Sequence, residues 1–374
     1  MVRSLFLLVS LIAGLLIPAF CQQTITGTLV HDNITRNYRL RLPKNFSPSE
    51  KLPLVFNFHG FTSNATQQEL YSNMNPVADT ARFAVCYPNG INAAWNVGWS
   101  FGSTADDVGF TEAMIEKFVA EYGFDRERIY ACGMSNGGFF SYHLACNLSD
   151  KIAAIASVTG SMVPGSLDLC NPGRSVPVLE IHGTADDVVQ YNGSPNISIP
   201  VDSVMAFWSR NNGCSPDVTV ESIPDINTTD QSTVEKIAYE DCNQQHEVVL
   251  YKVFGGGHTW PGAPLNIGVT NRDIHASTEI WRFFNRYTRN TSTGISSILP
   301  EIRLYPNPVH DNLFISTDQP ITRVEVYSLQ GMNMFTAASS GLVPEIPCQN
   351  WPACIYLVRF LVKDKWIIQK IQKM

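Results

Sequence analysis

The feature that most constrains the fold of this chain is a series of short apolar runs, each ending in glycine or a polar residue. They lie at 53–60, 83–90, 128–135, 152–160, 176–183 and 247–257. Continuous apolar runs of strand length are typical of parallel strands that are covered on both faces of a sheet. Segments with helical spacing of apolar residues, such as 66–81 and 111–123, lie between them. This alternation predicts an α/β protein with an open, mostly parallel sheet.

The two ends of the chain differ from this pattern. Residues 24–42 alternate apolar and polar side chains in two stretches, which predicts a β-hairpin. Residues 289–300 are mostly small and polar and predict a linker. The short alternating runs beyond them predict a small C-terminal β-sandwich at 301–374. We therefore expect a main domain at 22–288 that is followed by the linker and the sandwich.

The first residues have the composition of a secretory signal peptide at 1–21. Arg3 precedes an apolar run, and small residues precede a cleavage point that we expect after Cys21. A lipid-anchored Cys21 is the alternative interpretation. No other stretch is long and apolar enough to cross a bilayer. The sequence therefore predicts a secreted, extracellular protein, and attachment to the cell surface is left open.

Charge and cysteine content narrow the possible functions. A net charge of −7 and the lack of any Lys/Arg-rich run argue against nucleic acid as a partner. Removal of the signal peptide would leave eight of the nine cysteines, an even number that suits an oxidising compartment. We interpret Cys86 and Cys132, which lie inside apolar runs, as buried free thiols. Sequence neighbourhood favours three disulfides: Cys146 with Cys170, Cys214 with Cys242, and Cys348 with Cys354.

A nucleophile motif lies between an apolar run and a helical segment. Residues 133–137 read Gly-Met-Ser-Asn-Gly and match G-x-S-x-G, whose glycines let a strand turn sharply into a helix. The serine hydroxyl then projects above the sheet. A glycine-rich helix start is the alternative, but the motif has the strand before it and the helix after it that such a nucleophile needs. We therefore expect Ser135 to be a catalytic nucleophile.

A serine nucleophile needs a base and an orienting carboxylate, which follow in the chain order Ser, Asp or Glu, His. Among the eight histidines, His246 precedes its apolar run and His275 opens the last helical segment. His258 follows three glycines after that run, so we expect it to be the base. The acid should follow the run at 176–183, where Asp186 and Asp187 are both candidates.

Other residues are assigned supporting roles. Acyl transfer needs N–H donors for the oxyanion, and we expect them to be the backbone groups of Asn136 and Phe61, with Thr62 as the alternative to Phe61. His59 would hold the loop that carries Phe61. Asp106 and Asp107 most simply cap a helix. The chain shows no metal-binding motif, so neither a metal nor another cofactor is expected. Three aromatic residues are expected to line the substrate pocket: Trp95, Trp99 and Trp260.

Several separated blocks resemble one family. From 36 to 288 the chain is similar to the extracellular polyhydroxybutyrate-depolymerase-like and feruloyl or acetylxylan esterases of the α/β-hydrolase superfamily. The blocks are "FHGFTSN" (58–64), "YPNG" (87–90), Trp99 with "DDVGF" (106–110), "FDRERIYACGMSNGG" (124–138), "IHGTADDVV" (181–189) and "GGGHTWPG" (255–262). The resemblance implies a mostly parallel, roughly eight-stranded sheet with helices on both faces. It also implies Ser135 as nucleophile, His258 as base and Asp186 as acid. Phe61 and Gln190 depart from the usual family residues.

The tail resembles a second family, the C-terminal sorting domains of the type IX secretion system. The likeness rests on "LYPNPVHDNLFIS" (304–316), "VEVYSLQGM" (324–332) and "IYLVRF" (355–360). A carbohydrate-binding β-sandwich is the alternative. If the likeness holds, secretion machinery is a partner of the tail, and the tail takes no part in hydrolysis.

These resemblances imply a secreted serine esterase that releases feruloyl or acetyl groups from xylan through an acyl-enzyme. The substrate would be an ester-bearing polymer or oligomer. Polyhydroxyalkanoate depolymerisation is the alternative activity, and a non-catalytic binding module on a hydrolase fold is a further one. A dead copy would be expected to lack one of Ser135, Asp186 or His258, and all three are present.

Overall fold

The computed structural model describes residues 23–289, 303–317, 320–328, 332–338, 345–362 and 365–374. The chain divides into two compact units, Met1–Ser292 and Thr293–Met374. The expected signal peptide and nearly all of the expected linker lie outside the described residues. No helix in the described part of the chain is long and apolar enough to span a membrane.

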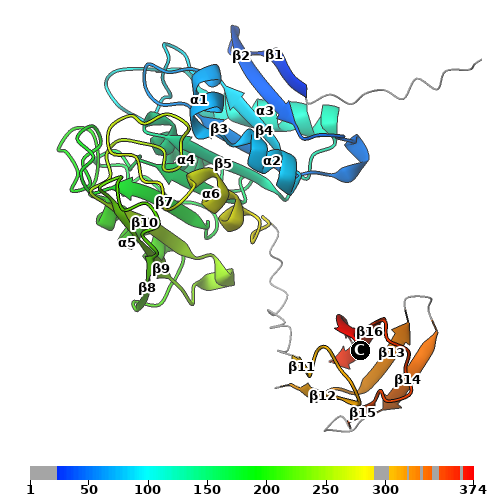
Figure 1. Cartoon of the computed structure of the whole chain (residues 1–374). Helices are drawn as coiled ribbons and strands as arrows, with labels where there is room; N and C mark the ends of the chain where they lie inside the picture. The colour runs from blue at the N-terminus through cyan, green and yellow to red at the C-terminus, as the bar shows by residue number, and fades with distance from the viewer. Residues whose placement is uncertain (1–22, 290–302, 318–319, 329–331, 339–344, 363–364) are drawn as a thin grey trace, which may run out of the picture. The chain divides into compact units, whose positions relative to one another are not determined.

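The first unit is built on one ten-stranded sheet in the order β1-β2-β4-β3-β5-β6-β7-β10-β9-β8 (Figure 1). The six apolar runs form its parallel centre, β4-β3-β5-β6-β7-β10. The predicted hairpin forms β1 and β2, which pair antiparallel with each other and with β4. The ten strands of the sheet are β1 (Gln23–His31), β2 (Ile34–Leu42), β3 (Leu54–Phe58), β4 (Ala84–Pro88), β5 (Ile129–Met134), β6 (Ala154–Val158), β7 (Val178–Gly183), β8 (Val218–Ile223), β9 (Thr233–Tyr239) and β10 (Val248–Phe254).

The sheet is larger than the roughly eight strands that the resemblance implied. The difference is the antiparallel hairpin of β8 and β9, which extends the edge beyond β10. Strand β8 is almost wholly exposed, as suits the last strand of an open sheet. The expected α/β architecture with helices on both faces is confirmed.

Helices cover the two faces of the sheet, and each face has its own core. In β3, for example, Leu54 and Phe56 pack into the core with α3, α4 and α5, whereas Val55 packs into the core with α2 and α6. This alternation follows from the period of two along a strand. The helices are α1 (Ala65–Ser72), α2 (Asn75–Ala81), α3 (Asp107–Tyr122), α4 (Asn136–Asn147), α5 (Val201–Asn211) and α6 (Ala276–Phe284), with single turns η1 (Pro48–Glu50) and η2 (Asn243–Gln245).

The helix predicted over 66–81 is two helices. Helix α1 ends at Ser72, and the next residue, Asn73, adopts a left-handed backbone conformation with φ of 48°. Pro76 then lies in the first turn of α2. Because proline is accommodated in the first turn of a helix and disrupts its interior, this is a natural place for a break.

The regular elements in the described part of the second unit are all β-strands, as predicted. It contains a three-stranded sheet, β11-β12-β15, and a four-stranded sheet, β14-β13-β16-β17. Val324, Val358 and Phe360 are among the residues of its core. Its strands are β11 (Arg303–Tyr305), β12 (Asn312–Ser316), β13 (Arg323–Ser328), β14 (Asn333–Ala338), β15 (Ile346–Pro347), β16 (Ile355–Val362) and β17 (Lys365–Gln372).

Two of the three predicted disulfides are confirmed, Cys146–Cys170 and Cys214–Cys242. Cys86 and Cys132 are buried free thiols, also as predicted. The predicted Cys348–Cys354 bridge is wrong, because both residues are free cysteines. Cys348 is fully buried in the core of the second unit, and its thiol donates to the carbonyl of Ile346. Cys354 is partly exposed at the margin of the same core.

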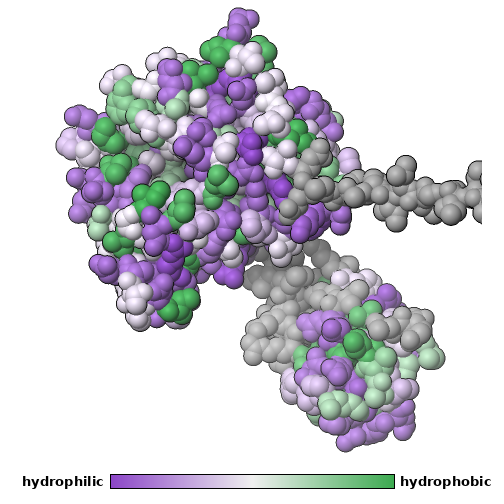
Figure 2. Space-filling view, turned by 45° about the horizontal axis from the view of Figure 1, so that its top comes forward, coloured by the Kyte–Doolittle hydropathy of each residue, from purple (hydrophilic) through white to green (hydrophobic). Residues whose placement is uncertain are grey.

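Figure 2 shows a surface on which hydrophobic side chains form small, separate groups among hydrophilic ones.

Candidate active site

Ser135 lies on a sharp turn between β5 and α4. Its backbone has φ of 53° and ψ of −122°, a combination that a residue with a side chain rarely adopts. The neighbouring strand holds the turn in place, because the N–H of Ser135 donates to the carbonyl of Val158 at 2.9 Å. Strained backbone of this kind is concentrated at functional sites. The turn is the strand-to-helix geometry that the G-x-S-x-G motif predicts.

The two glycines of the motif are required by close packing. A Cβ atom on Gly137 would lie 2.2 Å from the carbonyl oxygen of Phe58, and one on Gly133 would lie 2.5 Å from the Gly137 carbonyl carbon. Both contacts are with backbone atoms, which cannot turn aside as a flexible side chain could. The glycines therefore allow β3, β5 and α4 to approach closely beneath Ser135.

Asp186 and His258 meet at the ends of two neighbouring parallel strands, β7 and β10. Nδ1 of His258 lies 2.8 Å from Oδ2 of Asp186. The other carboxylate oxygen, Oδ1, accepts the backbone N–H groups of Val188 and Val189 at 2.9 and 2.8 Å. The Asp186 side chain is fully buried, whereas 17% of the His258 side chain is exposed. This is an imidazole oriented by a buried carboxylate, with its Nε2 edge left for another partner.

The structure separates the alternatives that the sequence left open. Asp187 is exposed, whereas Asp186 is buried and contacts His258. His246 is buried at the start of β10 and contacts the hydroxyl of Ser175 at 2.8 Å. His275 precedes α6, and its ring contacts Thr278. Neither is paired with the Asp186 carboxylate.

Ser135 and His258 line one cleft with a volume of about 660 Å³. Its other walls come from the loop after β3, from helix α1 and from the loop after His258. Within the described residues the Ser135 hydroxyl makes no hydrogen bond. Nucleophile–base contacts in ligand-free sites are often long and tighten when substrate binds. The cleft is lined by Gly60, Phe61, Thr62, Ser63, Gln67, Gln68, Leu70, Tyr71, Met134, Ser135, His258, Leu265 and Ile267.

The two residues expected to supply oxyanion donors are near Ser135, because Asn136 follows it in the chain and Phe61 lines the same cleft. Asn136 is the first residue of α4, where backbone N–H groups have no partner within the helix. The N–H of Thr62 donates to the Ala93 carbonyl at 2.9 Å, so that alternative donor is already engaged. In the part of the chain that the structure describes, the N–H of Phe61 has no hydrogen bond. The side chain of Asn136 is turned inward and exchanges two hydrogen bonds with the backbone of Trp95.

His59 supports the loop before Phe61. Its Nδ1 lies 2.7 Å from the Gly60 carbonyl, which can only accept, so Nδ1 carries the proton. Its Nε2 then accepts from the N–H of Gly90 at 3.0 Å. Burial lowers the pKa of His59 to about 4, which keeps the ring neutral. This arrangement fits the structural role that the sequence suggested.

Two of the three tryptophans that were expected in the pocket are core residues, so that prediction is wrong for them. Trp260 is fully buried and donates through Nε1 to Ser277. Trp95 is also buried and donates through Nε1 to the His59 carbonyl. Each indole has found a hydrogen-bond partner inside the protein, as buried tryptophans usually do.

Trp99 is partly exposed and begins an aromatic row that leads to the cleft. Its ring stacks on Phe101 at 5.1 Å, and Phe101 meets Phe61 edge-on at 5.8 Å. Phe61 is 42% exposed and Phe101 is 43% exposed. Sequence reasoning missed Phe101, although its position two residues after Trp99 was a usable signal.

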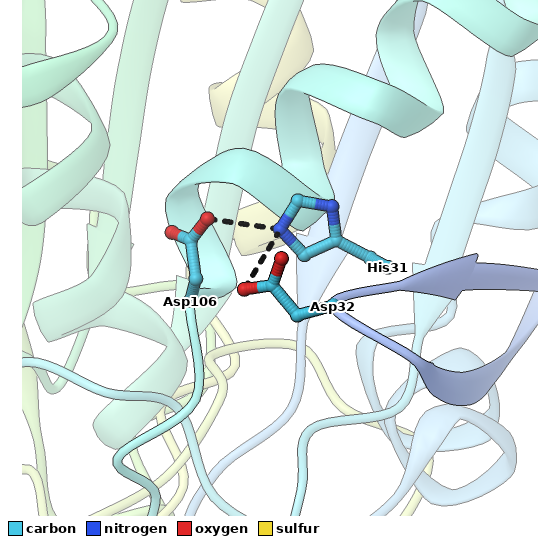
Figure 3. Close-up of side chains that lie close together, drawn as sticks. All are labelled: His31, Asp32 and Asp106. Atoms are coloured by element: carbon cyan, nitrogen blue, oxygen red, sulfur yellow. Dashed lines mark hydrogen bonds and ion pairs between the residues drawn. The ribbon is translucent and has the colours of Figure 1, made fainter.

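A second cluster of titratable side chains lies at the N-terminal end of α3 (Figure 3). Nε2 of His31 lies 2.9 Å from Asp106 and 3.8 Å from Asp32. Asp106 also accepts the N–H of Gly109, so it caps α3 as the sequence predicted. Both carboxylates are exposed. These contacts are those of a capped helix end, and we assign the cluster no metal-binding role.

Known proteins resemble the chain in sequence. Feruloyl esterase B from Piromyces equi is 30% identical over 236 residues, which are 60% of this chain and 42% of that protein. The chain therefore spans less than half the length of that relative. Feruloyl esterase D from Neurospora crassa is 26% identical over 277 residues, which are 71% of this chain and 86% of that protein.

Comparison with solved structures supports the fold. An acetyl xylan esterase from Aspergillus awamori superposes with a TM-score of 0.51 at 14% identity, over 70% of this chain and 99% of that one. The likeness confirms the α/β-hydrolase type of fold. Residues 303–374 match the secretion system C-terminal sorting domain, which confirms the second resemblance and indicates a secreted, extracellular protein.

The main unit also matches a family model. Residues 36–225 match the esterase PHB depolymerase family, which accounts for half of the chain. The matched segment includes Ser135 and Asp186, whereas His258 lies beyond it. The chain belongs to the esterase PHB depolymerase family.

Proposed function

We propose that this protein is a secreted carboxylic ester hydrolase that uses Ser135, His258 and Asp186. The observation that carries the proposal is the 2.8 Å contact between His258 and the buried Asp186 at the wall of the cleft that Ser135 enters. The strained turn at Ser135 and the N–H groups of Phe61 and Asn136 support it.

The reaction follows from these groups. Nε2 of His258 takes the proton of Ser135 while Oγ attacks the ester carbonyl, and the negative charge forms beside the N–H groups of Asn136 and Phe61. His258 then protonates the leaving alcohol, and the acyl group stays on Ser135. Water, deprotonated by His258, releases the acid and restores the serine. Asp186 stabilises the imidazolium in both halves of the cycle.

We propose feruloyl esters of xylan as the preferred substrate and acetyl esters as the second. The cleft of about 660 Å³ is in the range that holds a drug-sized group, much larger than an acetyl group. Its rim carries exposed apolar side chains, with Leu70 68%, Leu265 66% and Ile267 57% exposed. An aromatic acyl group suits these walls. Trp99, with Phe101 and Phe61, offers ring faces on which the sugar chain next to the ester could stack.

Polyhydroxyalkanoate is the alternative to both xylan esters. The exposed apolar side chains at the rim of the cleft favour it, because a polyester surface would bury them. The secretion machinery is the proposed partner of the C-terminal unit, on the basis of the sorting-domain match.

The test uses the full chain and three substrates. Release of acid from methyl ferulate, acetylated xylan and a short polyhydroxybutyrate film is measured for the wild type and for Ser135→Ala. We expect turnover of methyl ferulate to exceed that of the other two and Ser135→Ala to abolish all turnover. Ser141→Ala, which removes a hydroxyl bonded to the Gly137 carbonyl on the same helix, is the matched control. Retained turnover in Ser135→Ala would contradict the proposed mechanism, and film degradation without ferulate release would favour the polyester.

A further inference from the structure

A buried pair of titratable side chains, a carboxyl and an imidazole, lies behind the proposed catalytic acid. Glu180 and His182 share one face of strand β7, and both side chains are at most 1% exposed. Nδ1 of His182 lies 3.1 Å from Oε1 of Glu180. The other carboxylate oxygen of Glu180 accepts the hydroxyl of Tyr142 at 2.8 Å. The chemistry of ester hydrolysis described above uses none of these three groups.

His182 also touches the loop that carries Asp186. Its Nε2 lies 2.8 Å from the carbonyl of Val189, which can only accept, so Nε2 carries a proton. The same nitrogen lies 3.6 Å from Oδ2 of Asp186, the oxygen that bonds His258. The N–H of Val189 in turn holds Oδ1 of Asp186. His182 therefore holds the loop that carries Asp186. It also faces the Asp186 carboxylate, which in turn orients His258.

The acceptors around His182 decide its charge. Its ring faces three oxygen acceptors, from Glu180, Val189 and Asp186, and the described residues offer it no hydrogen-bond donor. Burial alone lowers the pKa of His182, but the hydrogen bond and charge of Glu180, with the charge of Asp186, raise it above its ordinary value. Burial raises the pKa of Glu180 and so favours its neutral form, but Nδ1 of His182 and the hydroxyl of Tyr142 both reach its oxygens. With donors on the carboxylate and acceptors on both ring nitrogens, the ion pair is the favoured form.

We propose that Glu180 and His182 are positioning residues, in which a buried imidazolium held by Glu180 fixes and stabilises the Asp186 carboxylate for ester hydrolysis. The inference rests on the proposed function. A positive charge behind Asp186 offsets part of the field that this carboxylate exerts on His258. Removal of that positive charge would therefore strengthen the field of Asp186 at His258.

Other charged and titratable groups near His182 are accounted for. The ring of Tyr191 lies 5.9 Å from that of His182, and its hydroxyl donates to Asp202 on α5. Lys252 on β10 is paired in register with His182 on β7, and its Nζ lies 4.7 Å from the centre of the Tyr191 ring. Neither contacts the His182 nitrogens, so Glu180 and Asp186 dominate its surroundings.

The test compares His182→Gln and Glu180→Gln with the wild type. The glutamine amide at 182 can still donate to the Val189 carbonyl but carries no charge, and Glu180→Gln leaves a neutral imidazole. We expect kcat for a small aryl ester to fall about tenfold to a hundredfold in each variant, with KM nearly unchanged. We also expect the acid limb of the kcat/KM profile to move up by about half to one pH unit.

The matched control is His246→Gln, the same substitution at a buried histidine at the opposite end of the sheet. It is expected to change stability and to leave the acid limb in place. A direct measurement needs no variant: ¹⁵N chemical shifts of the wild-type His182 ring should show both nitrogens protonated at pH 7. A neutral ring at pH 7, or an acid limb in folded His182→Gln that matches the wild type, would overturn the proposal. If these results are not obtained but Ser135→Ala is inactive, the positioning role of Glu180 and His182 is refuted and the proposed function is not.

Discussion

Replacement of Asp186 by asparagine tests the acid–base pair with almost no change in shape. Oδ1 of Asp186 accepts two backbone N–H groups, so the asparagine amide keeps those bonds only if its oxygen occupies that position. Its NH₂ group then faces Nδ1 of His258, at the place where Oδ2 now lies at 2.8 Å. Two N–H groups cannot donate to each other. His258 must therefore carry its proton on Nε2, where it cannot accept the proton of Ser135.

The size of the effect follows from this forced tautomer. The equivalent substitution in a serine protease triad lowers kcat about 10⁴-fold, although the fold is retained. At about 1.36 kcal/mol for each factor of ten, this corresponds to about 5.5 kcal/mol of lost transition-state stabilisation. We expect a loss of that order for Asp186→Asn, with little change in KM because Asp186 does not line the cleft.

The neighbouring aspartate provides the control. Asp187→Asn makes the same chemical change one residue away, on an exposed side chain, and should retain nearly full activity. Both variants are assayed for kcat with an aryl ester, and thermal unfolding checks that each is folded. The reasoning is refuted if folded Asp186→Asn stays within tenfold of the wild type, or if Asp187→Asn loses as much activity as Asp186→Asn.

Three further predictions concern stability. Gly137→Ala places a methyl group 2.2 Å from a backbone carbonyl and should lower the free energy of unfolding, measured in urea, by about 2–3 kcal/mol or more. Gly173→Ala, where the nearest atom is 3.8 Å away, should leave that free energy nearly unchanged. Loss of the Cys146–Cys170 disulfide, which spans 24 residues, should lower the free energy of unfolding by about 3 kcal/mol, and an unchanged melting temperature in the double alanine variant would contradict this. Burial lowers the pKa of His246 to about 4, so the unfolded chain binds more protons than the folded chain between that value and about 6.5. The free energy of unfolding should therefore fall by up to about 3 kcal/mol as the pH drops through this window, and His246→Gln should remove that part of the slope.

The centre of the fold was predictable because each parallel strand is apolar on both faces. Runs such as 128–135 and 176–183 therefore stand out without any knowledge of their partners. The hairpin of β8 and β9 was missed for the opposite reason: β8 is the edge strand, β9 lies next to it, and both carry many polar side chains. Their alternation in "DVTVESI" (217–223) was a signal that could have found them.

The candidate site was predictable where chemistry fixes chain order, and less so where only packing decides. The G-x-S-x-G motif selected Ser135, and the order Ser, Asp, His then selected His258; the catalytic roles of both remain predictions. That order left two neighbouring aspartates open, the resemblance favoured Asp186, and the structure shows that Asp186 is the buried one. Trp260, two residues after the proposed base, shows the limit of nearness in sequence. In a loop, residues two apart can point to opposite sides, and its ring enters the core. A charged side chain inside an apolar strand needs a buried partner. Glu180 was therefore a usable signal, and it went unused.

Hydrogen bonds join the loop that carries Asp186 to the loop that carries His258. The carbonyl of Gly256 accepts the N–H of Ala185 at 3.0 Å, and the N–H of Gly255 donates to the hydroxyl of Thr184 at 2.9 Å. A Cβ atom on Gly183 would lie 2.2 Å from the same Gly256 oxygen, so glycine at 183 is what lets the loops approach.

This joining answers a problem of distance in the sheet. Strands lie about 4.8 Å apart, so β7 and β10 end about 10 and 15 Å from the end of β5, which carries Ser135. The side chains on these strand ends cannot meet unless a loop reaches back across the sheet. Because the glycines tie the loop after β10 to the loop after β7, the acid and the base can reach the nucleophile as one unit. A substitution at Gly183 should therefore displace both of them together while leaving the turn at Ser135 intact.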